Sequence, residues 1–465
     1  MNDRFAALAV ACLAFWAFLW LSPQDPGNAQ VITRLGLTLS IVEHGDLSID
    51  RVAHRTIDKA EFGGRFYADK APGHSFLAIP AVAAARAAFA ALGWPTDWTE
   101  RTVFDRYAYV ATPATNGLIS ALAAALVLLL ARRLGASSAG AVFAAGALAL
   151  GTPFLGWSTA FFAHSVSGGL LLLSLALVVW AAEGRRVRRW SAAGLAMGYC
   201  AVVDLTAAPT LVVIGLLALC LALRKGSLAP CVAGLALGGI VGAAPLVLYN
   251  ELAFGDPFRL GYSGVVGFRG MQQGLFGVGV PDPAVMAELL FGLYRGLLPL
   301  SPVLLLAPAG LLAMALRHGT RPVALVIALA FLSLLAINAG YFYWNGGWSV
   351  GPRHLVPALP LLALSLAFAW PRRAALRGLV LGLLLVSMAL SLVCAAGGMF
   401  APEQYRNPLL EWVLARFLEP EALLRSVPVL LSWAAFAWLL DRAAATDPQP
   451  RIASRPDSRQ KSSCE

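Results

Sequence analysis

The sequence predicts an all-α polytopic membrane protein with about 12–13 transmembrane helices. Of its 465 residues, 59% are hydrophobic and only 13% are charged, whereas soluble domains carry about 25% charged residues. Apolar residues also recur in runs of roughly 17–25 residues, and a run of that length crosses a bilayer as a helix.

The apolar segments follow one another from end to end, mostly with short connections. The first contains FAALAVACLAFWAFLWLS and follows a single basic residue, Arg4. It lacks a small-residue cleavage site before Asp25, so we expect a retained helix and not a signal peptide. The predicted segments are 5–21, 73–93, 108–131, 137–154, 165–183, 191–204, 207–223, 228–249, 300–316, 322–343, 355–370, 375–396 and 427–440.

The basic residues predict the orientation of these segments. The formal net charge is +10, and arginines cluster in short connections such as RRVRR at 185–189 and RHGTR at 317–321. This pattern follows the positive-inside rule, so membrane topology explains the charge and nucleic-acid binding is not expected. Segment 73–93 must then begin and end outside, as a re-entrant or interfacial helix, unless one arginine cluster breaks the rule.

We expect one integral-membrane domain over residues 1–441, with long extracytoplasmic loops at 22–72, 250–299 and 397–426. The polar, proline-containing stretch 442–465 is predicted to be a disordered cytoplasmic tail. The six cysteines show no CxxC or metal-ligand spacing. No disulfide framework and no metal site are therefore predicted.

The first long loop carries the most distinctive chemistry. It holds seven of the 25 acidic residues, and its stretch GGRFYADKAPGHSFLAIP (63–80) sets Asp69 and Lys70 at the entrance of segment 73–93. The lysine has two interpretations. Its ammonium is a compact charge suited to phosphate, and it is equally an ordinary anchor at headgroup depth.

Several short motifs on the predicted outer side resemble those of the GT-C superfamily, the polytopic glycosyltransferases that use lipid-linked sugars. The similarity is greatest to the branch of protein O-mannosyltransferases and lipid A aminoarabinose transferases. YADKAP (67–72) resembles the Y-x-x-K-P-P element that opens a helix after their first outer loop. Further similar stretches are LTLSIVEHGDLSID (37–50), GTPFLGWSTAFFAHS (151–165) and YWNGGWSVGPRHLVPALPLL (343–362).

The resemblance implies a polyprenyl-phosphate-linked sugar as donor, with Lys70 contacting its phosphate. Arg353 is a second candidate for the phosphate, because guanidinium binds phosphate oxygens in a bidentate manner. Tyr67, His354 and His164 are further candidate substrate-binding residues. Each has a plainer alternative: Arg353 as an interface anchor, and the histidines as structural residues at helix ends.

Sugar transfer also needs a carboxylate that deprotonates the acceptor. The early acidic pair of the family would fall at GNAQV (27–31), which contains no acid. Asp25 lies a few residues earlier and is a possible substitute. Otherwise we expect the base among Asp46, Asp50, Asp58 and Asp69, with Asp58 and Asp69 favoured. Asp69 has the alternative role of holding Lys70 in place, and the sequence leaves divalent-metal dependence open.

The predicted function is a glycosyltransferase of the bacterial inner membrane that acts on an envelope lipid, glycan or protein at the extracytoplasmic face. Its partners are the bilayer, the lipid-linked donor and the acceptor. The alternatives are a transporter or flippase of a lipid-linked substrate, an O-antigen ligase-like enzyme, and a noncatalytic scaffold. Transporters typically contain internal repeats, and the sequence shows none.

Overall fold

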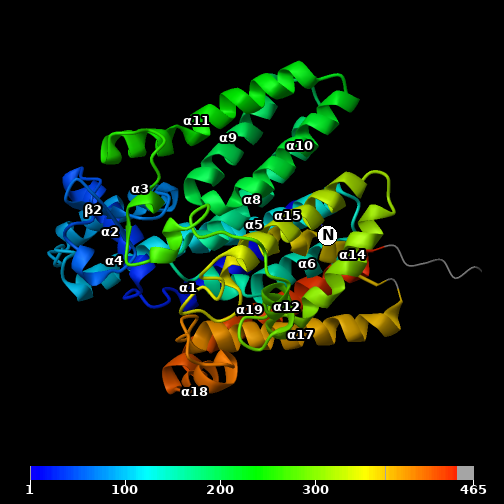
Figure 1. Ribbon diagram of the computed structural model, residues 1–465. Coiled ribbons are helices and arrows are strands. Elements are labelled where there is room, and N and C mark those ends of the chain that lie inside the picture. Colours follow the sequence, from blue (N-terminus) through cyan, green and yellow to red (C-terminus); the bar gives the residue numbers. More distant parts are fainter. Residues whose placement is uncertain (1, 372, 448–465) are drawn as a thin grey trace, which may run out of the picture.

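The computed structural model describes residues 2–371 and 373–447, which form a predominantly helical molecule (Figure 1). Nine helices of this described part are long and apolar enough to cross a membrane. They are α1 (Asp3–Leu21), α3 (Gly73–Ala91), the continuous helix Arg101–Arg133 that contains α4 (Arg101–Thr112) and α5 (Leu118–Arg133), α8 (Ala163–Ala181), α10 (Ala208–Arg224), α11 (Leu228–Phe254), α15 (Arg321–Gly340), α17 (Ala374–Gly397) and α19 (Pro420–Thr446).

Shorter elements complete the fold. Three shorter apolar helices contain α6 (Ser138–Leu150), α14 (Ala307–Ala315) and α16 (Leu359–Ala369), the last preceded by the 3₁₀ helix η7 (Arg353–Ala358). The other α-helices are α2 (Ala29–His44), α7 (Phe154–Trp157), α9 (Val187–Val203), α12 (Pro283–Phe291), α13 (Leu297–Leu300) and α18 (Leu414–Phe417). The strands are β1 (Lys59–Phe62), β2 (Arg65–Ala68) and β3 (Val265–Val266), in the order β2-β1-β3.

The predicted fold class is confirmed, and each predicted apolar segment coincides with a helix. The chain is a multi-pass membrane protein. At its C-terminal end, α19 continues to Thr446, past the predicted start of the tail at residue 442. Residues 448–465 of that predicted tail lie outside the described residues.

The topology explains segment 73–93. Arg132 Nε at the end of α5 lies 3.0 Å from Asp3 Oδ1 at the start of α1, so these two helices run in opposite directions. The end of α1 and the start of α4 therefore lie on the same side, and α3, which comes between them, does not contribute a crossing. Helix α3 packs beside α2, and Arg86 of α3 forms an ion pair with Glu43 of α2. Both helices lie at the end of the molecule where β2 and α4 also lie (Figure 1).

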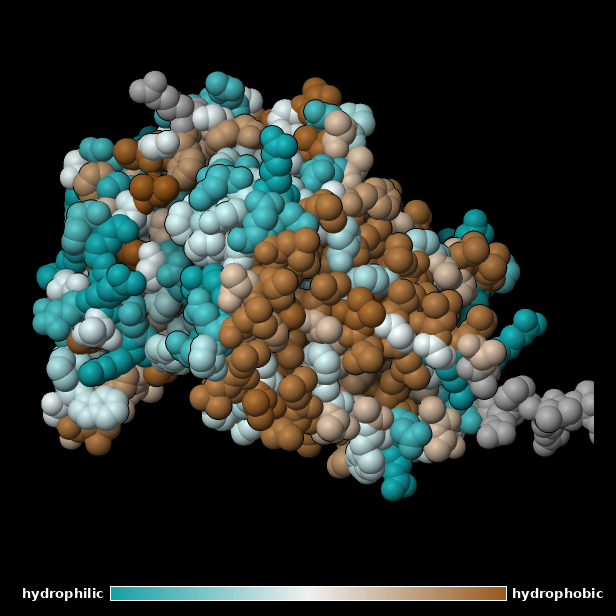
Figure 2. Space-filling model, turned by 90° about the horizontal axis from the view of Figure 1, so that it is seen from below, coloured by the Kyte–Doolittle hydropathy of each residue, from teal (hydrophilic) through white to brown (hydrophobic). Residues whose placement is uncertain are grey.

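Without α3, the described residues hold twelve apolar helices: eight of the nine long ones, the three shorter ones and α9, whose 17 residues begin among the arginines of RRVRR. A chain that crosses at each of these helices in turn places connections such as RRVRR and RHGTR on the side opposite the long loops, as the positive-inside rule requires. In Figure 2 a broad apolar surface covers the middle of the molecule, and polar side chains gather at the end that carries the first loop.

Close backbone contact holds α9 against α11. A Cβ on Gly238 of α11 would lie 2.0 Å from the carbonyl oxygen of Ser191, and one on Gly194 of α9 would lie 2.5 Å from that of Leu235. Small residues at such positions let membrane helices approach where the surrounding lipid supplies no hydrophobic driving force.

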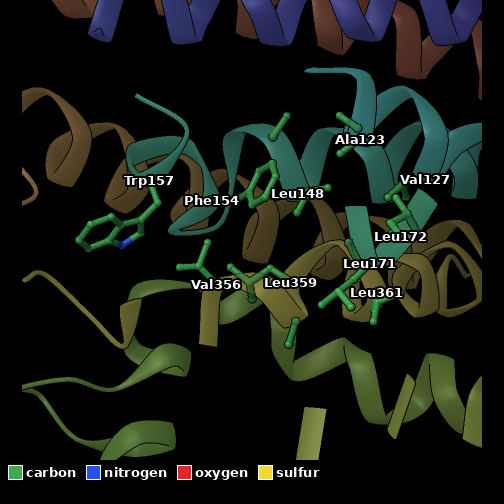
Figure 3. Close-up of a cluster of buried hydrophobic side chains, with 14 of the residues drawn as sticks. Ala123, Val127, Leu148, Phe154, Trp157, Leu171, Leu172, Val356, Leu359 and Leu361 are labelled. Carbon is green, nitrogen blue, oxygen red and sulfur yellow. The ribbon is translucent and has the colours of Figure 1, made fainter. Parts of the chain in front are cut away.

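The buried core joins the helices whose outer ends form the site. Figure 3 shows Leu148, Leu171, Val356 and Leu359 packed together, with Trp157 of α7 at one side of the cluster. These side chains come from α6, α8, η7 and α16. They are all less than 2% exposed, so α8 and η7 are held in fixed relation by tight packing.

Candidate active site

A cavity of about 600 Å³ opens among helix ends and long loops, on the side that the sequence predicts to be extracytoplasmic. We call it the outer cavity. Among the residues that the sequence singled out, it is lined by Asp25, Asp58, Lys70, His164, Arg353 and His354. Residues that extend its wall include Asn28, Gln30, Arg34, Asp204, Thr206, Tyr262, Phe276, Asn338, Tyr341, Tyr343 and Trp348.

A β-hairpin brings Asp58 to Lys70. Strands β1 and β2 pair antiparallel, with Lys59 opposite Ala68. The residues just outside that pair, Asp58 before β1 and Asp69 after β2, therefore meet at the open end of the hairpin. The turn is Gly63-Gly64, at φ of 59° and 76°. These left-handed angles suit the tight two-residue hairpin turn and are costly for residues with a Cβ.

Lys70 lies between two carboxylates. Its ammonium donates to Asp69 Oδ2, and its Nζ lies 3.6 Å from Asp58 Oδ1. Burial alone would lower the pKa of this lysine, but the charges of Asp69 and Asp58 outweigh burial and raise the pKa above its ordinary value of 10.5. Asp69 is 1% exposed and does not line the outer cavity. Its position agrees with the alternative role of holding Lys70 in place.

Two arginines bring further positive charge to the outer cavity. Arg34 of α2 is 5% exposed and Arg353 of η7 is 9% exposed. In the described chain, neither Arg34 Nε nor Arg353 Nε has a hydrogen-bond partner. Burial lowers the pKa of the Arg34 guanidinium, although neighbouring acidic groups oppose this effect. Buried guanidinium N–H groups without partners are costly, so this arrangement suits an anionic ligand.

Asp204 and His164 form a second polar group in the outer cavity. Asp204 follows α9, and its Oδ1 accepts hydrogen bonds from Thr206 N at 3.1 Å and Thr206 Oγ1 at 2.7 Å. Its Oδ2 faces His164 Nδ1 at 3.7 Å. The His164 ring lies edge-on to that of His354, with 5.3 Å between the ring centres.

The segment between α15 and η7 forms one wall of the outer cavity. Arg295 stabilises this segment by donating hydrogen bonds to its backbone. This arginine is fully buried. It donates from Nε to Asn345 O and from Nη2 to Gly347 O, both at 2.7 Å. Tyr343 of the same segment donates to Glu403 Oε1 of the third long loop at 2.7 Å. These contacts set the path of the chain that leads into Arg353.

Besides Asp69, the candidate residues Asp46, Asp50 and Tyr67 lie away from the outer cavity. Asp50 accepts from Phe66 N at 2.7 Å and from Arg65 Nε at 3.0 Å, so its carboxylate braces the first-loop hairpin. Tyr67 is 7% exposed and packs against Phe254, with 5.4 Å between ring centres. Both side chains are engaged in the structure of the loop, and neither lines the outer cavity.

Asp25 does line the outer cavity, although the stretch 27–31 contains no acid. Its Oδ1 accepts from Gly27 N at 3.2 Å, and partial burial raises the pKa of its carboxyl. Within residues 2–371 and 373–447, no group of three His, Cys, Asp or Glu side chains is placed to hold a metal ion.

Sequence reasoning missed Arg34, Asp204 and Asn338 as wall residues of this cavity. A signal was present for each, because each interrupts or ends an apolar helical stretch. Ionisable and strongly polar residues in such stretches generally face a protein interior or a polar cavity. Arg34 lies in the middle of α2, where residues 30–40 are all buried.

No protein-family model matches the sequence, and a search of the curated proteins finds no match. Solved structures do match. The crystal structure of ArnT from Cupriavidus metallidurans bound to undecaprenyl phosphate aligns with a TM-score of 0.55 and 18% sequence identity, over 94% of this chain and 75% of that one. The apo structure of the same protein aligns with a TM-score of 0.53 and 17% identity, over 95% of this chain and 75% of that one.

The chain shares the polytopic helical fold of these ArnT structures, and the likeness extends over nearly all of the present chain. The fold expected from the first-loop motif and the late arginine segment is thereby confirmed. At 18% identity the likeness concerns the arrangement of the helices, and the chemistry of the outer cavity must be argued from its own residues.

Proposed function

We propose that this chain is an integral-membrane glycosyltransferase of the bacterial inner membrane. It transfers a sugar from a polyprenyl-phosphate donor to an envelope lipid, glycan or protein at the extracytoplasmic face. One observation carries the proposal: Lys70, Arg34 and Arg353, from three separate parts of the chain, line one outer cavity in a GT-C fold. ArnT, which has this fold, was crystallised bound to undecaprenyl phosphate.

In this proposal the three cations hold the donor phosphate. Arg34 and Arg353 offer N–H groups that have no partner within the described residues, and Lys70 supplies an ammonium already fixed by two carboxylates. As the bond between the sugar C1 and the phosphate oxygen breaks, its electron pair stays on that oxygen. Fixed cations stabilise the charge that develops there without having to reorient.

The acceptor oxygen or nitrogen forms the new bond to C1 and gives its proton to a carboxylate. Of the favoured loop acids, Asp58 is the one that lines the outer cavity, and we propose it as this base. In this proposal the role of Asp69 is to hold the Lys70 ammonium in place. Asp50, which braces the hairpin, has no part in the reaction.

Reconstitution of the full chain in proteoliposomes tests the proposal. The assay supplies undecaprenyl-phosphate sugars as donors and envelope fractions of the host as acceptors. Lys70→Ala and Asp58→Asn should each lower transfer by roughly 100-fold or more, as loss of a transition-state contact does elsewhere. Lys59→Ala and Asp50→Asn are matched controls from the same loop that do not line the cavity, and both should retain transfer.

The alternatives give different results in the same vesicles. Movement of the lipid-linked sugar across the membrane without transfer would favour a transporter or flippase. Transfer at the wild-type rate by both Lys70→Ala and Asp58→Asn would remove these two residues from the reaction centre.

A further inference from the structure

One wall of the outer cavity carries polar groups that the phosphate contacts do not use. They belong to Asp204, His164, His354 and Asn338, which we call the inner subsite. Asp204 and His164 are each 8% exposed, and Asn338 is 2% exposed. In the described part of the chain, hydrogen-bond partners are lacking for Asp204 Oδ2, both ring nitrogens of His164, His354 Nε2, and both Asn338 amide atoms.

These residues lie together. His164 contacts both Asp204 and His354. Its Nδ1 lies 3.7 Å from Asp204 Oδ2, and its ring centre lies 5.3 Å from that of His354. The His354 ring lies 5.8 Å from that of Tyr341, and Tyr341 N donates to Asn338 O. The four residues come from the start of α8, the end of α9, the last turn of α15 and η7. Their convergence is therefore a property of the helix packing.

The chemistry of the inner subsite differs from that of the phosphate contacts. Among the described residues, the ion-pair contact of Asp204 Oδ2 is with His164, and no lysine or arginine lies within 4.0 Å of it. A carboxylate without a cation repels an anion and accepts hydrogen bonds from hydroxyl groups. The Asn338 amide both donates and accepts, as a hydroxyl does. This set matches a ligand that is rich in hydroxyl groups and carries no negative charge.

The position of the inner subsite indicates which ligand that is. His354 directly follows Arg353, which the proposed function assigns to the donor phosphate. A group bound at His354 is thus adjacent to the phosphate. In a polyprenyl-phosphate sugar, the group adjacent to the phosphate on the side away from the lipid is the sugar.

We infer that the inner subsite binds the donor sugar, and that this sugar carries no negative charge and has free hydroxyl groups that donate to Asp204 Oδ2 and pair with the Asn338 amide. His164 supports Asp204, and His354 lies between the sugar and the phosphate. The inference rests on the proposed function, because it places a polyprenyl phosphate at Arg353. It adds a residue set and a class of sugar to that function.

Binding experiments on the full chain in nanodiscs test the inference without requiring turnover. The probes are undecaprenyl phosphate alone and undecaprenyl phosphate carrying glucose, mannose or arabinose. Wild type should bind at least one sugar-bearing probe more tightly than the bare phosphate. Asp204→Asn and Asn338→Leu should each reduce that preference by roughly tenfold, the usual scale of a lost buried hydrogen bond to a charged or fully buried partner.

Both variants should bind bare undecaprenyl phosphate at least as tightly as wild type, because neither removes a cation and Asp204→Asn removes a negative charge. Ser391→Ala is a matched control: its hydroxyl is also buried and without a partner, but lies on α17 outside the outer cavity. It should leave the preference unchanged. Melting temperatures of all variants separate loss of the subsite from loss of the fold.

The outcomes distinguish the two proposals. If wild type binds bare undecaprenyl phosphate but prefers none of the sugar-bearing probes, the inner subsite is not a sugar site. The same holds if folded Asp204→Asn and Asn338→Leu keep the full preference, which would mean that ordered water satisfies these groups. If wild type does not bind undecaprenyl phosphate, the proposed function fails and the inner subsite fails with it.

Discussion

Asp58 Oδ1 and Lys70 Nζ lie 3.6 Å apart across the open end of the first-loop hairpin, and Asp69 holds the same ammonium from the other side. Lys70 is therefore a fixed charge at the wall of the outer cavity. A snorkelling anchor would instead direct its ammonium toward water at headgroup depth. The side chain of Lys70 is only 15% exposed.

This arrangement predicts how stability depends on pH. The folded pKa of Lys70 is raised above 10.5, so the stabilisation by its ion pairs is fully present below pH 10.5 and is lost only as pH rises through the higher folded value. Lys70→Met should lower the free energy of unfolding by about 3 kcal/mol at pH 7, since it leaves two carboxylates without their cation. Melting curves of both proteins between pH 7 and 10 should show a constant difference, and a difference that falls steadily over this range would contradict the assignment.

Arg295 is predicted to be a positioning residue for the wall that leads into Arg353. Arg295→Met leaves the carbonyls of Asn345 and Gly347 without their donors, which should cost about 2–4 kcal/mol of stability. Affinity for undecaprenyl phosphate should fall as well, because the segment before Arg353 loses its support. Arg295→Lys should recover part of both losses. The control is Arg259→Met, which removes a half-exposed arginine paired with Asp256 at 3.8 Å and should change neither quantity.

Tyr343 and Glu403 are predicted to couple the third long loop to the outer cavity. The hydrogen bond between them is 2.7 Å long, and a double-mutant cycle with Tyr343→Phe and Glu403→Ala should give a coupling of about 1 kcal/mol in thermal unfolding. Additive effects of the two substitutions would show that the contact does not contribute. Asn345 also contacts Glu403, so Asn345→Ala provides a third corner for the same measurement.

The α9–α11 contact allows a comparison of neighbouring glycines. Gly238→Ala forces a methyl group to within 2.0 Å of the Ser191 carbonyl and should destabilise the protein by about 1–3 kcal/mol. At Gly239 the nearest atom to a new Cβ is 3.9 Å away. Gly239→Ala should be neutral or slightly stabilising, since alanine favours helix more than glycine does. Equal melting temperatures for the two variants would rule out close packing at Gly238.

Several site residues were predictable because their signals are local. The polar first loop, the lysine at the start of an apolar segment, and the arginine after a glycine-rich stretch are visible without knowing any contact. Lys70, Asp58, Arg353, His354 and His164 all line the outer cavity. The side of the membrane on which they lie follows from the arginine clusters alone.

Other assignments depended on partners that are distant in sequence. Tyr67 packs against Phe254, and Asp50, which precedes the hairpin, accepts a hydrogen bond from Arg65 of β2. The motif that contains Tyr67 does not predict that Phe254, which lies much later in the chain, will pack against it. Arg34 and Asn338 were overlooked because only the packing of helices that are distant in sequence shows that both line the outer cavity.

The sequence by itself determined the membrane class of the protein and the positions of its apolar helices, and it predicts the side on which its loops lie, because transfer of apolar segments into a bilayer depends on local hydrophobicity and flanking charge. Only the tertiary structure decided that α3 does not add a crossing, that Asp69 accepts a hydrogen bond from the Lys70 ammonium, and that Asp204, His164 and Asn338 share a cavity wall. Those relationships depend on packing between helices and on the register of one hairpin, and neither is encoded in any single stretch of the chain.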